Sequence, residues 1–533
     1  MVSSIIKNKN LIFLFLIILL FELVSINFAR YNYDGFHLGF ILSSSYELDN
    51  GKYIYKDFFY PYGILNLYLN NILLKIFNYN IFHLYIFYIQ IYIIGIIFFY
   101  RLVKSIINIQ FATFSIIVLF LLHPYVLKPW HNYLLFFLVN LFIYFKFKNT
   151  LKNDLLASFI LGISFLFSET FFLASFLIFI LDLILSYKFF RFKNIFYKFI
   201  IFLSPLLIFF IYLNYAELYN IWLKSTNTFT VLLGYFYKKN FLDYLLSYFV
   251  LLSSSYKNIL TAPYIFFYFI IFLTNILFIL LNLKAIIKSD DNKKIFLFFL
   301  ACLNLILISQ SLNNISIFKL VTLSSFGLIV LLYLIDNAND IYLKKGSMIV
   351  VISLCIMTFY NENLNKLQIK HEMISAPKNN LSFIGSQKYD QKTWQNLKYL
   401  NTSIFKIKQK CKIDYFVNFT NDAFYYFILR KNFKSLQYFH WFQNIPRNFQ
   451  NTFYLSLYNN FDRGINKKIR KQIDNNNIIF VTDFYNQNKI KFISDDINYD
   501  YEYIEFKNYY FINLPYSDIH GKKILLIPNN CKF

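Results

Sequence analysis

Long apolar runs recur through the first two thirds of this chain and restrict its fold more than any other feature. A helix that crosses a hydrocarbon core about 30 Å thick needs about 20 apolar residues. The pattern therefore predicts a polytopic α-helical membrane protein with about 11 spans. The runs lie roughly at residues 11–29, 81–100, 111–126, 133–145, 155–167, 171–186, 195–213, 263–283, 295–309, 315–335 and 348–359.

Composition supports a membrane protein and excludes several other classes. Hydrophobic residues make up 58% of the chain and charged residues 15%, against about 45–50% and about 25% in soluble domains. A disordered chain, a nucleic-acid-binding arm and an ordinary cytosolic enzyme do not fit these values. The net charge of +24 says little about anionic partners, because an A/T-rich gene favours Lys, Phe, Tyr, Ile and Asn. We expect membrane lipids as partners and no nucleic acid.

The placement of basic residues predicts the orientation of the helices. Lys7 and Lys9 precede the first run, and no small-x-small cleavage site follows it, so we expect a retained helix with a cytoplasmic N-terminus. Basic residues then recur in every second loop, as the positive-inside rule requires of cytoplasmic loops. Asp182, which interrupts an apolar run, is expected to reach the inner interface. The inner loops are 101–110, 146–154, 187–194, 284–294 and 336–347.

Two stretches leave the number of spans open. The runs 155–167 and 171–186 are short and can form one broken or re-entrant element around Ser168, Glu169 and Thr170. The stretch 64–77 is also apolar, but three asparagines interrupt it, so it is interpreted as an interfacial helix.

The same alternation places residues 361–533 outside the cytoplasm, after a transmembrane domain of residues 1–360. This segment has the size of one soluble domain, and short apolar stretches predict an α/β fold. Strands are expected near 478–482, 501–506, 510–514 and 523–527. Cys411 and Cys531 form no CxxC pair and can form a disulfide in an oxidising compartment.

The first outer loop, residues 30–80, contains the most suggestive chemistry. Asp34 follows the first span, and His37 lies one helical turn further on. A helix is expected near 39–48, ended by Asp49-Asn50-Gly51. Gly is rare in this chain, so its recurrence in this loop suggests backbone positions that need tight turns or close approach.

This arrangement resembles the GT-C superfamily of membrane glycosyltransferases. The likeness rests on Asp-x-x-His after the first span, an Asn-Gly-Lys turn, Asp57-Phe58-Phe59 and Tyr62-Gly63. In particular, the chain is similar to bacterial relatives of protein mannosyltransferases (glycosyltransferase family 39) and of aminoarabinose transferases. The resemblance implies a polyprenyl-phosphate-linked sugar donor and a catalytic aspartate at Asp34. Ser168-Glu169 departs from many relatives, which have a lysine there.

The chemistry of glycosyl transfer assigns roles to the outer-face residues. Asp34 is the expected general base for an acceptor hydroxyl, with Asp57 as a second catalytic carboxylate. The leaving lipid phosphate needs cations or hydrogen-bond donors, and no cofactor is required. A divalent metal is possible in principle, but no residue spacing calls for one. The candidate substrate-binding residues are His37, Tyr62, His123, Lys128, His131 and Glu169.

Simpler interpretations stay open for each of these residues. Asp34 and Asp57 can be capping or turn residues, the histidines can lie at the interface without binding anything, and Glu169 can be solvated.

The sequence therefore predicts a bacterial inner-membrane enzyme of the cell envelope that transfers a hexosyl or pentosyl group with inversion to a lipid, glycan or protein acceptor. Two alternatives remain. One is a transporter or flippase of a lipid-linked glycan, although no paired halves are visible. The other is a surface-polysaccharide polymerase or ligase, whose main loop would be 214–262.

Overall fold

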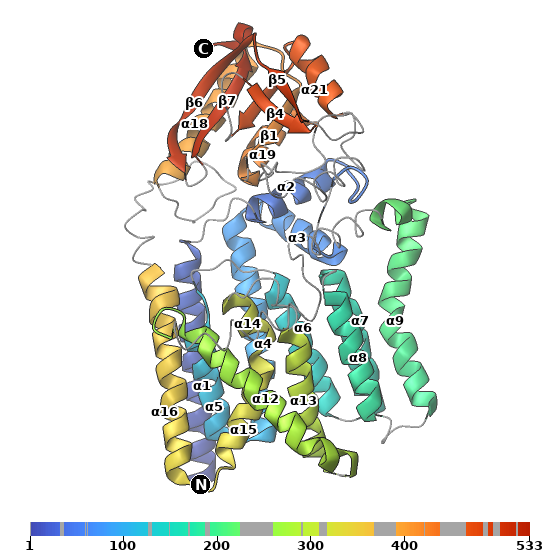
Figure 1. The fold of residues 1–533 in the computed structure, drawn as a ribbon, viewed down its shortest axis with the longest axis vertical. Helices are drawn as coiled ribbons and strands as arrows, with labels where there is room; N and C mark the ends of the chain where they lie inside the picture. Colours follow the sequence, from blue (N-terminus) through green and yellow to red (C-terminus); the bar gives the residue numbers. More distant parts are fainter. Residues whose placement is uncertain are drawn as a thin grey trace.

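A computed structural model defines the fold of most of the chain. It describes residues 2–31, 37–58, 60, 62–125, 131–148, 150–168, 171–186, 192–223, 259–288, 291–308, 317–366, 391–420, 422–436, 465–482, 489–493, 501–518 and 521–533. Figure 1 shows long helices at one end of the molecule and a sheet with its helices at the other, with α2 and α3 between them.

A helix forms at each of the predicted apolar runs, because only a helix satisfies all its backbone polar groups within one apolar segment. The helices of this bundle are α1 (Val2–Ala29), α4 (Ile81–Ile106), α5 (Ile109–Leu122), α6 (His131–Phe147), α7 (Leu151–Phe167), α8 (Phe172–Ser186), α9 (Phe192–Tyr215), α12 (Pro263–Lys288), α13 (Asn292–Ile308), α14 (Ile317–Leu323), α15 (Ser325–Asp336) and α16 (Ile341–Phe359). A short π-helix, η4 (Tyr360–Asn365), continues α16.

Several of these helices can cross a membrane. In the part of the chain that the structure describes, four are long and apolar enough: Ile81–Ile106, Asn194–Tyr215, Pro263–Lys284 and Ile341–Asn365. Shorter apolar helices of 10–17 residues accompany them. The chain is thus a helical membrane protein, and the count of about 11 crossings stays a prediction.

One predicted span is broken. The run 315–335 forms two helices, α14 and α15, that meet at Ser324 with a bend of 64°. Ser325 donates a hydrogen bond to the carbonyl of Val321, and such side-chain bonds to the preceding turn often bend helices. The apolar pattern predicted the segment but not its break.

The first loop forms two helices at one end of the bundle, which we call the loop end. These are α2 (His37–Asp49) and α3 (Ile64–Ile76). The first loop also makes a close backbone contact there, because a Cβ added to Gly63 would collide with the backbone of Leu166 and Phe167 at the end of α7. The helix predicted at 39–48 is confirmed.

The C-terminal segment builds a small α/β domain, as predicted. Its five-stranded sheet has the order β2-β1-β3-β7-β6, in which β1 pairs in parallel with β2 and β3, and β7 pairs antiparallel with β3 and β6. The bounds are β1 (Tyr415–Phe419), β2 (Lys434–Ser435), β3 (Ile478–Thr482), β6 (Tyr509–Asp518) and β7 (Gly521–Pro528), with a hairpin of β4 (Lys489–Ile493) and β5 (Tyr501–Glu505).

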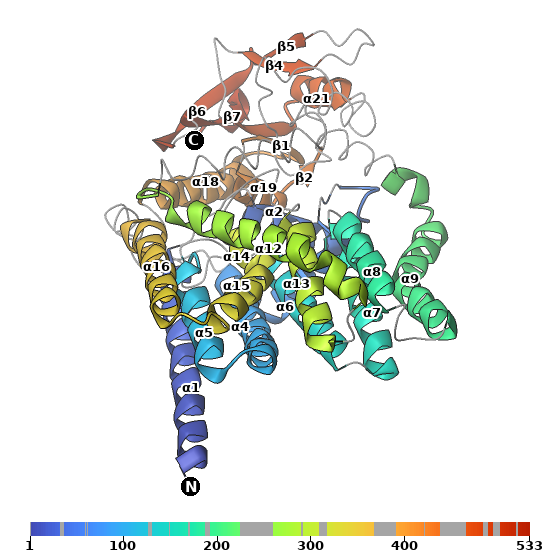
Figure 2. The ribbon, with the colours of Figure 1, turned by 60° about the horizontal axis from the view of Figure 1, so that its bottom comes forward.

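Helices and a disulfide complete this domain. They are α18 (Gln391–Lys410), α19 (Ala423–Arg430) and α21 (Ile465–Asp474), with a 3₁₀ turn, η7 (Asn529–Cys531). Cys411, after α18, is joined to Cys531 in η7, a pairing that the sequence left open. Figure 2 shows α19 lying over α2, between the sheet and the bundle.

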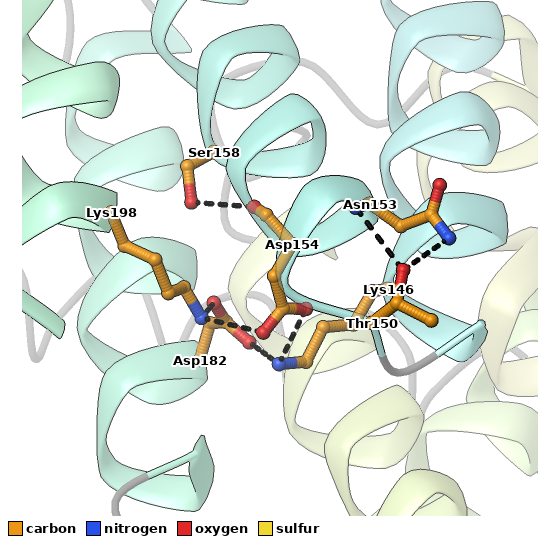
Figure 3. A network of polar contacts seen from close by, with 7 residues as sticks. All are labelled: Lys146, Thr150, Asn153, Asp154, Ser158, Asp182 and Lys198. Atoms are coloured by element: carbon orange, nitrogen blue, oxygen red, sulfur yellow. Dashed lines mark hydrogen bonds and ion pairs between the residues drawn. The ribbon is translucent and has the colours of Figure 1, made fainter. Parts of the chain in front are cut away.

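A ring of four charges joins four helices (Figure 3). It lies at the end of the bundle opposite the loop end, because Asp154 lies in the first turn of α7 and the other end of α7 contacts Gly63. Lys146 of α6 lies 3.3 Å from Asp154 of α7 and 2.6 Å from Asp182 of α8. Lys198 of α9 contacts the same two carboxylates, Asp154 at 3.6 Å and Asp182 more closely. Each cation therefore bridges both anions, and the ring is neutral.

The ring corrects two sequence interpretations. Asp182 does not extend into solvent, since it is 1% exposed and ion-paired within the bundle. Lys146 was counted among the topology-setting lysines of an inner loop. Its ammonium group instead faces the interior of the helix bundle, where it pairs with Asp182. Burial of an unpaired charge is costly, so the four groups are tolerable only together.

We expect Lys198→Met to destabilise the protein by about 3–5 kcal/mol, because it leaves one buried carboxylate without a cation. Asp182→Leu added to Lys198→Met should recover most of this loss, since Lys146 and Asp154 remain a neutral pair. Thermal unfolding is followed with a thiol-reactive dye that labels Cys302 and the buried Cys355 as they become exposed.

Lys75→Met is the matched control. Lys75 lies 2.6 Å from Asp49 in an exposed pair, and loss of such a pair costs about 0–1 kcal/mol. A double variant no more stable than Lys198→Met would show that packing, and not charge balance, decides stability at the ring.

Candidate functional site

The first loop is largely buried where it packs across the loop end of the bundle. Most side chains of α2 are buried, from Leu38 to Ser45 and again at Glu47. Helix α3 packs beside α2, and the C-terminal helix α19 lies on it. A surface loop would not need such burial, so α2 is part of the folded core.

Asp34 lies outside the described residues, but its neighbours in the chain are placed. Arg30 and Tyr31 follow α1, and His37 begins α2. Arg30 is partly buried, its guanidinium lies 5.9 Å from the centroid of the Phe82 ring, and its Nε has no hydrogen-bond partner. Within the described part of the chain Arg30 forms no ion pair with a carboxylate, so its guanidinium can bind an anionic ligand.

Burial within the first loop keeps His37 in its neutral form. Burial lowers its pKa from 6.5 to about 4, because an apolar surrounding disfavours the charged imidazolium. At neutral pH it can therefore exchange hydrogen bonds with a ligand but adds no positive charge. This limits its predicted role to donating or accepting a hydrogen bond.

The turn that contains Tyr62 lies next to the end of α7. Gly63 touches the backbone of Leu166 and Phe167, and Ser168 follows directly. Glu169 itself lies outside the described residues. Tyr62 packs edge-on to the Tyr60 ring, 5.4 Å between centroids, and burial raises the pKa of its hydroxyl. The structure thus brings the Tyr62 turn against the last residues of α7.

Asp57 has a structural partner within its own turn. Its carboxylate accepts a hydrogen bond of 2.8 Å from the backbone N–H of Tyr53, while its own N–H donates to the Tyr53 carbonyl at 2.9 Å. This geometry matches the simpler interpretation of Asp57 as a turn residue.

His123 is enclosed at the loop end of α5 and is 3% exposed. Its Nε2 lies 3.0 Å from the Tyr133 hydroxyl, and its ring centroid lies 4.8 Å from that of Phe21 and 4.9 Å from that of Tyr92. Its Nδ1 and the Tyr92 hydroxyl are both buried without a hydrogen-bond partner. The aromatic rings surround His123, so an ionic phosphate contact is unfavourable there.

A π-helical segment fixes the turn after His123. Asn363 in η4 donates to the His123 carbonyl at 2.9 Å and accepts from the Tyr125 N–H at 2.7 Å. Lys128, in the same turn, lies outside the described residues. His131 begins α6, but its side chain is also outside them.

The candidate residues therefore form two groups. The turns around Asp57 and Tyr62 pack with α7 and α9, whereas His123 packs with α1, α4 and α6. No contact among the described residues joins Asp57 to His123. No group of three His, Cys, Asp or Glu within the described part is placed to hold a metal ion.

A buried polar network at the loop end was missed by sequence reasoning. Tyr60 donates to Asn66 Oδ1 at 2.9 Å, Asn70 donates to the same oxygen at 2.6 Å, and Tyr88 donates to Asn70 Oδ1 at 2.8 Å. The asparagines had been interpreted as interruptions of an interfacial helix. Their i, i+4 spacing, which puts both on one face, was the available signal.

Lowering the pH should destabilise the loop through His37. In the unfolded chain His37 takes up a proton near pH 6.5, but the folded protein resists this until about pH 4. The contribution of neutral His37 to stability is therefore complete above pH 6.5 and is lost as the pH falls through this window. The free energies of unfolding of wild type and His37→Gln, measured by tryptophan fluorescence, should therefore converge as the pH falls.

Comparison of the sequence with protein-family models and with curated proteins finds no match.

Proposed function

We propose that this protein transfers a sugar from a polyprenyl-phosphate-linked donor to a lipid, glycan or protein acceptor. The reaction would take place at the loop end, beside the first loop. Asp34 takes the proton of the acceptor hydroxyl as its oxygen bonds to the anomeric carbon. The bond from that carbon to the phosphate oxygen breaks at the same time, and the lipid phosphate leaves with the electron pair.

The observation that carries the proposal is Arg30, a cation that pairs with no carboxylate among the described residues and that precedes the proposed base in the sequence. Arg30 directly follows α1 and lies four residues before Asp34 in the sequence. Its Nε is buried and has no hydrogen-bond partner, and the described chain supplies no carboxylate for it. A leaving phosphate would supply the negative charge that pairs with the Arg30 guanidinium.

The other candidate residues take supporting parts. Asp57 is assigned to the shape of its turn, because its carboxylate already accepts a backbone N–H. His37 and Tyr62 are neutral at working pH and suit hydrogen bonds to sugar hydroxyls. Arg30 replaces His123 as the favoured phosphate contact, since aromatic rings enclose His123.

A topology with about 11 crossings accompanies this function. We infer a cytoplasmic N-terminus and an extracytoplasmic C-terminal domain in a bacterial inner membrane. The recurrence of Lys and Arg in alternate loops supports this orientation. The Cys411–Cys531 disulfide supports it too, because such bonds persist in oxidising compartments.

A transporter of a lipid-linked glycan is the second candidate, and the broken α14–α15 segment favours it. Near the break, a Cβ added to Gly327 would collide with the amides of Asn275 and Asn304. Asn275 Oδ1, both amide atoms of Asn304 and Ser324 Oγ are buried without partners. Broken helices with polar groups deep in the bundle are typical of transporters.

Asp34→Asn should lower the transfer rate about 10²–10⁴-fold relative to wild type, because asparagine cannot accept the proton. Arg30→Gln should lower kcat by about 10²-fold and Arg30→Lys by less. Transfer is measured with a polyprenyl-linked sugar library in nanodiscs. Asp49→Asn, a second carboxylate of the same loop, is the control; full activity of Asp34→Asn would contradict the proposal.

Asn304→Leu separates the two candidates. A transferase should keep its activity, since removing unsatisfied buried groups is neutral or stabilising. A transporter should lose glycan uptake into vesicles. Asn282→Leu is the control, because among the described residues the Asn282 amide bonds within its own helix, at the Phe278 carbonyl.

A further inference from the structure

An ion pair joins the first loop to the C-terminal domain. Glu47 of α2 accepts two hydrogen bonds from Arg430 of α19, at 2.6 Å from Nε and 3.0 Å from Nη2. Tyr426, one turn earlier on α19, donates its hydroxyl to Glu47 at 2.7 Å. Both oxygens of the carboxylate thus accept hydrogen bonds from a single helix, and Tyr426 of that helix lies 379 residues from Glu47 in the sequence.

Glu47 occupies a position that is unfavourable without this partner. It lies in the last turn of α2, where the helix dipole disfavours a negative charge, and it is 3% exposed. A buried carboxylate with no cation would destabilise its helix strongly. Helix α2 therefore tolerates Glu47 only while α19 supplies Arg430.

The rest of the interface between α2 and α19, which we call the joint, is packed as closely as a protein core. A Cβ added to Gly39 would collide with the backbone of Ala423 and Phe424. Ser43 donates its hydroxyl to the Ala423 carbonyl at 3.1 Å. These contacts need backbone of α2 and α19 at one fixed separation, so the interface is not one that slides.

We propose that the C-terminal domain is an activating partner in cis: docking of α19 on α2 completes the first loop, and Arg430 is the positioning residue that makes docking possible. The catalytic consequence rests on the proposed function, because Asp34 directly precedes α2. Without docking, the unpaired Glu47 would loosen α2, and the segment that contains Asp34 would lose its support. The two parts of the chain thus form one functional unit.

The test uses the full-length protein in nanodiscs and trypsin as the probe of the first loop. Lys52 and Lys56 follow α2 and are exposed, so cleavage there reports opening of the loop. Arg430→Met should speed this cleavage about tenfold or more and reduce transfer in parallel. The control is Lys431→Met, which removes the neighbouring exposed cation over the Phe427 ring.

A second variant separates docking from charge. Glu47→Leu combined with Arg430→Met removes both charges together, and we expect it to restore protection and activity. A bis-maleimide link between Ser43→Cys and Ala423→Cys, added to Arg430→Met, should also restore activity by imposing the joint. The native Cys411–Cys531 bond leaves those cysteines unreactive.

Protection and activity of Arg430→Met at the level of Lys431→Met would overturn the proposal. So would a linked Arg430→Met protein that is protected yet inactive while unlinked wild type is active. If no variant, wild type included, transfers a sugar, the proposed function fails, and the trypsin pattern alone then decides whether docking orders the loop.

Discussion

Charge neutralisation inside an apolar bundle is the constraint on which this structure depends. A lone Lys or Asp among apolar helices carries a heavy solvation cost. Here Lys146 and Asp154 come from one helical hairpin, and Asp182 and Lys198 come from the next. Each hairpin is neutral by itself, and the ring forms only when the two pack side by side. The ring thereby fixes α7, whose far end supports the first loop at Gly63.

The first loop is held from two sides by contacts of different kinds. The bundle approaches it through backbone packing at Gly63, and the C-terminal domain approaches it through Gly39 and the Glu47–Arg430 pair. The C-terminal domain is therefore not an independent appendage of the membrane part. One hydrophobic core continues from the long helices into α18, α19 and the sheet.

The sequence predicted the positions of helices and strands well, but not which distant side chains pair with one another. Apolar runs located the helices, and the strands near 478–482 and 523–527 were confirmed; the disulfide, which the sequence left open, is formed. Those features depend on local pattern or on few alternatives. The charge ring and the Glu47–Arg430 pair join residues that only the folded chain brings together, and Lys146 was hidden among topology-setting lysines. At the site, Asp57 matched a motif, but its turn geometry depends on the Tyr53 backbone, which no motif specifies.

The distance in sequence between α2 and α19 has a consequence for biosynthesis. Ser43 and Ala423, which meet in the finished protein, are 380 residues apart. At a translation rate of about 5–20 residues per second, α2 waits on the order of 20 to 80 seconds for its partner. During that time Glu47 and the small-residue face of α2 are uncovered at the membrane. The nascent chain therefore passes through a stage in which its helices can insert while its first loop is still unfinished.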